Sequence, residues 1–415
     1  MRARPVLDRL EDRCTPASVR AVAGILLITD PVGPLSVSVL APGVVNVTDS
    51  ATSANFSGIG SLISVRGTNL PDQIAVRANG VPFPGNVVIN SLNGGDAIDL
   101  SGTFNGNVTV IPGLGNDAVV STAANVRVGG VLTVADVAGA NTWLLNGRSW
   151  SVGLDLTYYG LTAFAMGATG QLRVGRFASL TAIQPVASSM SLAFNGLLTS
   201  VGRTFSITGG SAANLVSFTS KLTVGGNLFV SERGGATNAF HLTPAAGSTG
   251  VNGSLFYTGG TGPDSIVVGT NSAVGGNASF DLGNGNNSLM DGAGSTYSGD
   301  VTIFGGNDVT KIGLNGTIDG GLTLFAGNGT NTVNVTRVPS GLFRFRGGNG
   351  ADTLTLRGAG VYNMDASFGT GTNKLDTDQA DLILSGTVMG SGGDNTFDQG
   401  AATLLPPLFF IDFPV

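Results

Sequence analysis

A short signature that recurs every 21 to 26 residues is the feature that most limits how this 415-residue chain can fold. Each copy has a Gly-rich turn, then Asp or Asn, then residues that alternate in polarity. The copies begin at Asp72, Asp96, Asp117, Asn141, Asn214, Asn238, Asp264, Asn287, Asp308, Asn331, Asp352, Asn373 and Asn395. The wide gap between Asn141 and Asn214 is close to three steps, which predicts two degenerate copies within it.

A second signature, Gly-x-apolar-x-apolar, runs in phase with the first. It is found at Gly85, Gly106, Gly130, Gly226, Gly253, Gly276, Gly299, Gly320 and Gly341. Alternation with a period of two predicts short strands with one buried face. A unit with so few short strands cannot bury that face alone, so it must stack on its neighbours.

We therefore predict an all-β chain, a right-handed parallel β-solenoid (β-helix) of roughly 15 coils with about 22–24 residues each. Ladders of apolar side chains should fill it, with Leu324, Phe345 and Leu354 pointing inward. We assign residues 1–21 to an N-terminal export segment without fixed structure, 22–400 to a single solenoid and 401–415 to a C-terminal cap. The apolar run 404–411 should fold over the last coil, because the ends of solenoids need cover.

The charged and reactive residues narrow the classes of function. The chain has 20 Lys and Arg against 26 Asp and Glu, and its net charge of −6 disfavours a nucleic-acid partner. A single Cys, Cys14, excludes a disulfide framework and a Cys-based metal site. No apolar run is long enough to span a membrane as a helix. The single His, His241, lies between Phe240 and Leu242, which should face inward, so we expect it to face solvent.

Stacking should place the Asp or Asn of successive copies in one column, about 4.8 Å apart. From residue 264 onward we expect this column to read Asp264, Asn287, Asp308, Asn331, Asp352, Asn373 and Asn395. Alternation of carboxylate and amide reduces the repulsion between like charges and lets each Asn donate to a neighbouring acceptor. We therefore interpret the column as a structural Asx ladder that needs no cofactor.

Two turns of this column carry a second interpretation. Residues 347–354 read Gly-Gly-Asn-Gly-Ala-Asp-Thr-Leu, and residues 259–266 read Gly-Gly-Thr-Gly-Pro-Asp-Ser-Ile. Both segments resemble the RTX nonapeptide Gly-Gly-x-Gly-x-Asp-x-apolar-x, which implies calcium between stacked turns. Here the matches are isolated, and Asn replaces many of the Asp residues, whereas Ca²⁺ takes about six to eight oxygen ligands. If calcium binds, the candidate ligands are Asp72, Asp96, Asp117, Asp264 and Asp352.

Residues 10–17, Leu-Glu-Asp-Arg-Cys-Thr-Pro-Ala, resemble an N-terminal signature of large exported surface proteins of planctomycete-type bacteria. In those proteins the signature precedes β-strand repeats rich in Gly, Asn and Thr. The resemblance implies export and no particular activity, so we expect a secreted or cell-surface protein. The apolar stretch 21–28 has the character of a signal core, but Gly24 to Ile28 fits the repeat, so we predict a strand there.

The segment 143–166 gathers both Trp residues with other aromatic side chains, and we expect these to pack inside an irregular coil. Catalysis has little support, because Asp96 and Asp99 should point to opposite faces of one strand. We therefore expect a non-enzymatic structural or adhesive element of a cell surface or matrix. The alternatives are a calcium-stabilised RTX-like module and a carbohydrate-active β-helix. The expected partners are surface polysaccharide or other surface proteins, and the expected state is a monomeric rod.

Overall fold

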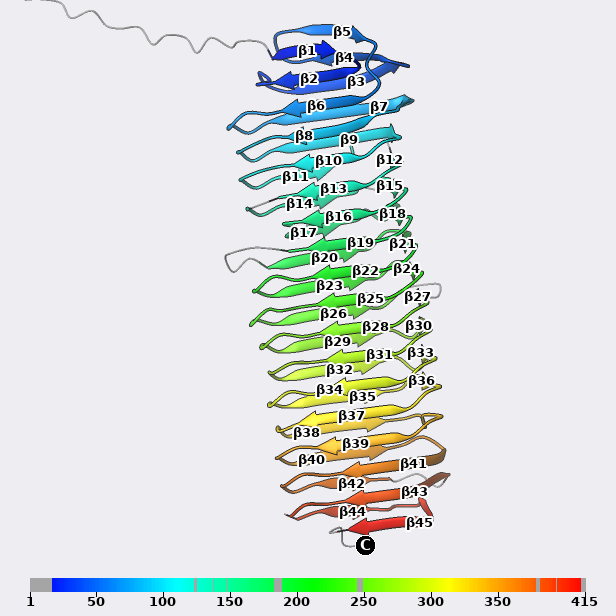
Figure 1. Cartoon of the computed structure of the whole chain (residues 1–415). Coiled ribbons are helices and arrows are strands. Elements are labelled where there is room, and N and C mark those ends of the chain that lie inside the picture. Colours follow the sequence, from blue (N-terminus) through cyan, green and yellow to red (C-terminus); the bar gives the residue numbers. More distant parts are fainter. Residues whose placement is uncertain are drawn as a thin grey trace, which may run out of the picture.

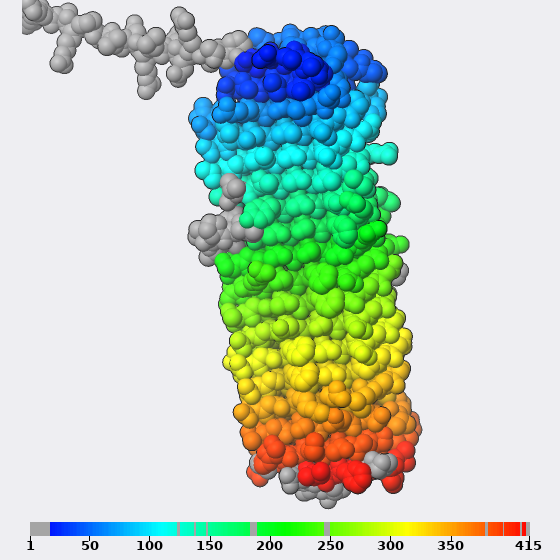
Figure 2. Space-filling view, in the orientation of Figure 1, coloured from blue at the N-terminus to red at the C-terminus, as the bar shows by residue number. Residues whose placement is uncertain are grey.

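The computed structural model describes residues 17–122, 125–136, 138–146, 148–182, 189–244, 249–377, 381–392 and 394–411. Within these residues the chain forms 45 β-strands and no helix, so no described segment could cross a membrane as a helix. The strands stack turn upon turn into one continuous rod (Figure 1, Figure 2). The predicted all-β parallel solenoid is confirmed, and it has about 14 turns.

Three sheets run along the rod, and most turns contribute one strand to each of them. The first sheet contains β1 (Ser18–Val22), β2 (Ile25–Thr29), β6 (Leu62–Arg66), β8 (Asn86–Asn90), β10 (Val108–Ile111), β13 (Leu132–Ala135), β16 (Leu156–Tyr159), β19 (Ala178–Thr181), β22 (Phe205–Thr208), β25 (Leu228–Ser231), β28 (Leu255–Thr258), β31 (Ala278–Asp281), β34 (Val301–Phe304), β37 (Leu322–Gly327), β39 (Phe343–Gly347), β41 (Gly360–Ser367), β43 (Leu382–Met389) and β45 (Thr403–Ile411).

The second and third sheets follow in each turn. The second sheet contains β3 (Leu35–Ala41), β7 (Gln73–Phe83), β9 (Ala97–Phe104), β11 (Ala118–Val120), β14 (Thr142–Leu144), β17 (Ala163–Ala165), β20 (Met190–Phe194), β23 (Asn214–Phe218), β26 (Asn238–Leu242), β29 (Asp264–Val268), β32 (Asn287–Asp291), β35 (Thr310–Leu314), β38 (Asn331–Val335), β40 (Asp352–Leu356), β42 (Lys374–Asp376) and β44 (Thr396–Asp398). The third sheet contains β12 (Val126–Val128), β15 (Ser149–Val152), β18 (Gln171–Val174), β21 (Leu198–Val201), β24 (Lys221–Val224), β27 (Thr249–Val251), β30 (Ser272–Val274), β33 (Thr296–Tyr297) and β36 (Thr317–Ile318).

Successive turns pair in parallel and in register along most of the rod. In the first sheet, for example, Val108 of β10 lies between Val87 of β8 and Leu132 of β13. As the chain descends in Figure 1, the nearer strands run leftward and the more distant strands run rightward, so the winding is right-handed, as predicted. With neighbouring strands about 4.8 Å apart, the stack is about 70 Å long.

The N-terminal end of the rod is built from antiparallel strands, which the repeat did not predict. β4 (Val44–Thr48) pairs with β3 on one side and with β5 (Ser53–Ser57) on the other. β1 pairs in antiparallel fashion with β2, so residues 18–21 belong to the fold, and the predicted export segment 1–21 extends too far. Residues 1–16 lie outside the described part of the chain. β2 also pairs in parallel with β6, which confirms the strand predicted at 24–28.

The C-terminal segment extends the first sheet. β45 pairs in parallel with β43 and forms one more rung, whereas we expected this segment to fold across the end. Leu404 and Phe410 pack against the core, and the Phe410 ring lies 4.7 Å from that of Phe397. Phe409 and Ile411 point outward. The inner face of this run therefore packs against the core and is partly buried.

Apolar ladders fill the interior between the three sheets. Leu324, Phe345 and Leu354 have no exposed surface, which confirms their predicted inward orientation. Leu354 of β40 lies between Val333 in the preceding turn and Leu375 in the next. Each inward side chain therefore packs mainly on its equivalents one turn away, as expected for a chain of stacked units.

The aromatic side chains of 143–166 form a buried cluster. The Trp143 ring lies 5.3 Å from Trp150, 5.7 Å from Tyr158 and 5.0 Å from Phe164. All four residues are buried, whereas Tyr159 is exposed on the first sheet. The predicted packing role of this segment is confirmed for the four clustered residues. Trp143, Trp150 and Tyr158 lie in the coil that begins at Asn141, and Phe164 lies in the next coil, where the signature is degenerate.

Replacing Leu354 with Ala should destabilise the rod locally. Loss of a fully buried Leu side chain and the cavity left behind should cost roughly 2–4 kcal/mol. Because turns couple to their neighbours, amide exchange should accelerate in β38, β40 and β42 and stay near wild type in β9 and β14. Hydrogen exchange read by mass spectrometry measures this, with Thr353→Ala on the outer face as the control. A uniform acceleration along the chain would contradict the nearest-neighbour account.

Candidate functional site

One side chain per turn forms a column at the start of the second-sheet strands, and we call it the Asx column. Strand register assigns its members in order. They are Asp72, Asp96, Asp117, Asn141, Thr162, Met190, Asn214, Asn238, Asp264, Asn287, Thr310, Asn331, Asp352, Asn373 and Asn395. Thr162 and Met190 are the two degenerate copies that the spacing predicted.

The prediction for one turn was wrong: Thr310, and not Asp308, occupies the column there. Thr310 pairs with Asn287 in the preceding turn and is fully buried. The register is set by Ile312 and Leu314, whose inward side chains leave Thr310 at the column position. Asp308 is exposed, and its Oδ2 accepts a hydrogen bond of 3.0 Å from the Gly285 amide. The predicted alternation of carboxylate and amide is therefore interrupted.

Hydrogen bonds along the column run in one direction, from each turn to the side-chain oxygen of the next. Where the donor residue is Asn, its side-chain amide donates: Asn238 Nδ2 lies 2.7 Å from Asp264 Oδ1. Where the donor residue is Asp, its main-chain amide donates instead: Asp264 N lies 2.8 Å from Asn287 Oδ1. The same pair of arrangements links Asn331, Asp352 and Asn373, at 2.8 and 3.0 Å. In each of these turns, Oδ1 of the Asx residue thus accepts from a donor one turn away.

Three acids occupy consecutive turns at the N-terminal end of the column. The Asp72 amide donates to Asp96 Oδ1 at 2.8 Å, and the Asp96 amide donates to Asp117 Oδ1 at 2.7 Å. Burial raises the pKa of all three carboxyls, and for Asp96 the charges of Asp117 and Asp72 add to the rise. Oδ2 of Asp96 and Oδ2 of Asp117 are buried without a hydrogen-bond partner in the described structure.

A fourth buried acid, Asp136, lies beside this group and was not predicted. It follows β13 and is fully buried. The side chain of Asp136 opposes part of the rise in the pKa of Asp117. Four buried carboxyls thus gather in this corner of the rod, and burial raises the pKa of those at Asp72, Asp96 and Asp117. This corner therefore retains protons more readily than exposed acids would.

The two turns that resemble RTX repeats need glycine for a steric reason. A Cβ atom at Gly259 would lie 1.9 Å from Asp264 Oδ2, and one at Gly347 would lie 2.3 Å from Asp352 Oδ2. The first Gly of each motif thus makes room for the carboxylate of the column. Burial raises the pKa of Asp264 and of Asp352 to about 6.

Glu232 is a buried acid with a strongly raised pKa, and the sequence analysis did not identify it. Its side chain is fully buried, and the Tyr257 hydroxyl donates to Oε2 at 2.8 Å. Burial, opposed in part by this hydrogen bond, raises the pKa of Glu232 to about 8. Leu228 and Val230 point inward, and the same alternation places position 232 inward. The period of two could therefore have predicted that Glu232 is buried.

Metal binding would require several of these oxygens to converge. Among the described residues, no three His, Cys, Asp or Glu side chains lie close enough together to share a metal ion. Asp72, Asp96 and Asp117 lie one per turn, and Asp264 and Asp352 lie in turns well separated from them and from each other. The arrangement favours hydrogen bonding along the column and retention of protons by buried acids.

The outer surfaces hold the remaining predicted polar residues. Asp96 is buried whereas Asp99 faces outward, where it meets Arg77 at 3.5 Å, so the two acids do not form a pair, as predicted. His241 alternates with the buried Phe240 and points outward, also as predicted. Neither residue lies among the acids of the column.

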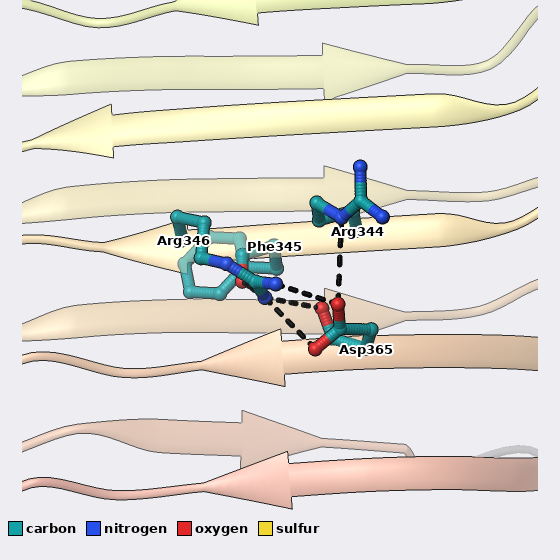
Figure 3. Close-up of polar contacts among 4 residues, drawn as sticks. All are labelled: Arg344, Phe345, Arg346 and Asp365. Carbon is teal, nitrogen blue, oxygen red and sulfur yellow. Dashed lines mark hydrogen bonds and ion pairs between the residues drawn. The ribbon is translucent and has the colours of Figure 1, made fainter.

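An ion-pair cluster fastens two rungs of the first sheet (Figure 3). Arg344 and Arg346 of β39 both reach Asp365 of β41, with nitrogen-to-oxygen distances of 3.4 Å and 2.5 Å. Hydrogen bonds from Arg346, aided by Arg344, lower the pKa of the Asp365 carboxyl. Such partly exposed pairs contribute at most about 1 kcal/mol each. We therefore regard the cluster as a local fastening between turns.

No protein-family model matches this chain, and no curated protein sequence is significantly similar to it.

Replacing Asp352 with Asn should remove a pH-dependent cost of folding. The pKa of Asp352 is raised in the folded chain, so its contribution to stability is full below about pH 4 and is lost as pH rises through about 6. The Asn variant stays neutral, and turn carbonyls accept the amides of Asn331 and Asn373 in the neighbouring turns. We expect the variant to be more stable than wild type at pH 8, by no more than roughly 3 kcal/mol, and to show a smaller loss between pH 5 and pH 8.

Chemical denaturation at both pH values measures this difference. Asp308→Asn is the control, because it removes an exposed carboxylate outside the column. If Asp352→Asn keeps the full pH dependence of the wild type, the buried carboxylate is not its source.

Proposed function

We propose that this protein is an exported, non-enzymatic β-solenoid that serves as a structural or adhesive element of a cell surface or extracellular matrix. One observation carries the proposal: the described strands from Ser18 to Ile411 all belong to one rod. Most Asx side chains of the column accept a hydrogen bond from the preceding turn through Oδ1. A body of this shape spans distance and presents long, regular faces, which suits a spacer or scaffold.

The first sheet offers the surface best suited to a polysaccharide partner. Phe229 stacks on Phe256 at 4.8 Å with an interplanar angle of 7°, and Phe304 stacks on Phe325 at 4.9 Å with an angle of 0°. These rings face outward and stay partly exposed. Exposed aromatic side chains beside polar groups offer both apolar and hydrogen-bonding contacts to a sugar. This surface supports adhesion to polysaccharide as part of the proposed function.

Export is the part of the proposal that one experiment tests directly. Native cells are separated into medium, intact cells and lysate, and the protein is followed with an antibody. We expect it in the medium, or on intact cells in a form that added protease removes. A cytoplasmic enzyme followed in the same fractions is the control for lysis. Recovery of the protein only after lysis, together with that enzyme, would overturn the proposal.

The alternative is a calcium-stabilised module, and the three consecutive acids are the observation that favours it. Asp72, Asp96 and Asp117 stack turn on turn, and two of them present a buried oxygen without a hydrogen-bond partner. A divalent cation would compensate for charge in this corner of the rod. The ladder interpretation explains the burial of the same acids differently: main-chain amides donate to Asp96 and Asp117, and the raised pKa values favour the neutral carboxyls.

Chelation separates the two interpretations. Under the ladder interpretation, EDTA should leave the melting temperature of the full chain nearly unchanged, and millimolar Ca²⁺ should add nothing beyond the effect of equal ionic strength. A specific site at 100 times its Kd would add about 2.7 kcal/mol and raise the melting temperature visibly. Such a rise, if Asp96→Asn abolishes it and Asp308→Asn does not, would favour the calcium module.

A further inference from the structure

The outer side of the second sheet carries a long face without formal charge. Eight consecutive strands, β11, β14, β17, β20, β23, β26, β29 and β32, present two outward side chains each. Most of these are Ala, Val, Leu or Met, and the others are Ser, Thr and His241. Leu215 and Met290 are 37% and 44% exposed. Extended apolar surfaces of this kind mark sites of association.

Charged residues lie at the borders of this face and on the other sheets. Asp99 of β9 borders it at one end, and Lys311 of β35 borders it at the other. The third sheet, by contrast, has charges within the same stretch of the rod, at Arg127, Arg173 and Lys221. The uncharged face is therefore a property of one side of the rod and not of the composition as a whole.

We propose that this face binds a second copy of the chain, with the two rods side by side and antiparallel. The two-fold axis would run parallel to the strands, between β20 and β23. That axis places the uncharged strands of one copy over those of the other, with β11 facing β32 and β14 facing β29. An isologous contact of this kind uses one surface twice and closes without further growth. The proposal replaces the expectation of a monomeric rod and does not depend on where the protein acts.

The charges at the two borders favour the antiparallel arrangement. Asp99 would face Gly313 of the second copy, which has no side chain. Lys311 of the second copy lies two residues from that glycine on the same strand. Lys311 has no ion-pair partner in the described structure, and Arg77 lies on the other side of Asp99 along the strand direction. With parallel rods, Lys311 would instead approach Lys311 of the second copy. Like charges that face each other disfavour that arrangement.

Shape at the same border agrees with this pairing. A hollow of about 370 Å³ lies around Asp99 and is lined also by Pro34, Gln73, Val120 and Thr122. In the antiparallel arrangement it faces Met290 and Lys311, the most prominent side chains at the opposite border. A side chain that projects from one copy would therefore meet a recess in the other.

The area of the face indicates how stable the proposed dimer should be. The eight strands of the face and the bordering β9 and β35, at a spacing of about 4.8 Å and with about 12 Å of length presented by each, give roughly 580 Å² of projected face per copy. Both copies together would bury roughly 1,150 Å², which is at the lower limit for a specific interface. We therefore expect a dimer that dissociates on dilution.

Sedimentation velocity across a concentration series tests the association. We expect the apparent mass to rise from 41.6 kDa toward twice that value as concentration increases. Ala193→Arg places two cations beside the axis and should keep the protein monomeric. Ser206→Arg, an equivalent change on the first sheet, should leave the association unchanged. A wild type that stays monomeric at high concentration, or an association indifferent to Ala193→Arg, would overturn the proposal.

Disulfide capture tests the register independently of stability. In a Cys14→Ser background, Val120→Cys and Met290→Cys are made as separate proteins, because these positions face each other in the antiparallel dimer. Under mild oxidation an equimolar mixture should cross-link much more than either variant alone. Cross-linking of each variant with itself, or none in the mixture, would refute this register. Small-angle scattering completes the test: a side-by-side dimer keeps nearly the length of the monomer, whereas a dimer of doubled length would refute the proposal.

Discussion

Parallel hydrogen bonding between successive turns is the constraint on which the rest of the structure depends. It fixes the rise at about 4.8 Å per turn, so every position repeats directly below its equivalent. A buried polar residue at one position therefore becomes a buried polar column. Asp264, Asn287 and Asn331 tolerate burial because the next or preceding turn supplies the matching donor or acceptor at the same spacing. The apolar ladders and the outward faces arise from the same repetition.

The sequence predicted the architecture well because its signals are repeated and local. The period predicted two degenerate copies between Asn141 and Asn214, and the strand register identifies them as Thr162 and Met190, neither of which is Asp or Asn. It failed where two local cues disagreed: an Asp before an apolar residue suggested Asp308, whereas inward Ile312 and Leu314 fixed Thr310. The antiparallel N-terminal strands escaped prediction because they do not share the repeat. Proximity of Asp136 to Asp117 depends on how turns meet across the core, which no spacing specifies.

The acids of the column show how one motif can have two physical explanations. A Gly-Gly-x-Gly-x-Asp turn suits a cation between stacked turns, but here its first Gly is also required by the carboxylate itself, at Gly259 and Gly347. A carboxyl without a cation can be accommodated by donors along the column and by holding its proton longer. Raised pKa values at Asp264 and Asp352 are the electrostatic signature of that solution.

The column is continuous in space but not as a chain of side-chain hydrogen bonds. Thr162 and Met190 interrupt it after Asn141, and Thr310 lacks an acceptor of the Asx type for Asn287. The side-chain hydrogen bonds of the column are therefore grouped into three separate segments. A rod pulled at its ends would carry the load across the two gaps through the strand ladders and the packed interior, which continue there.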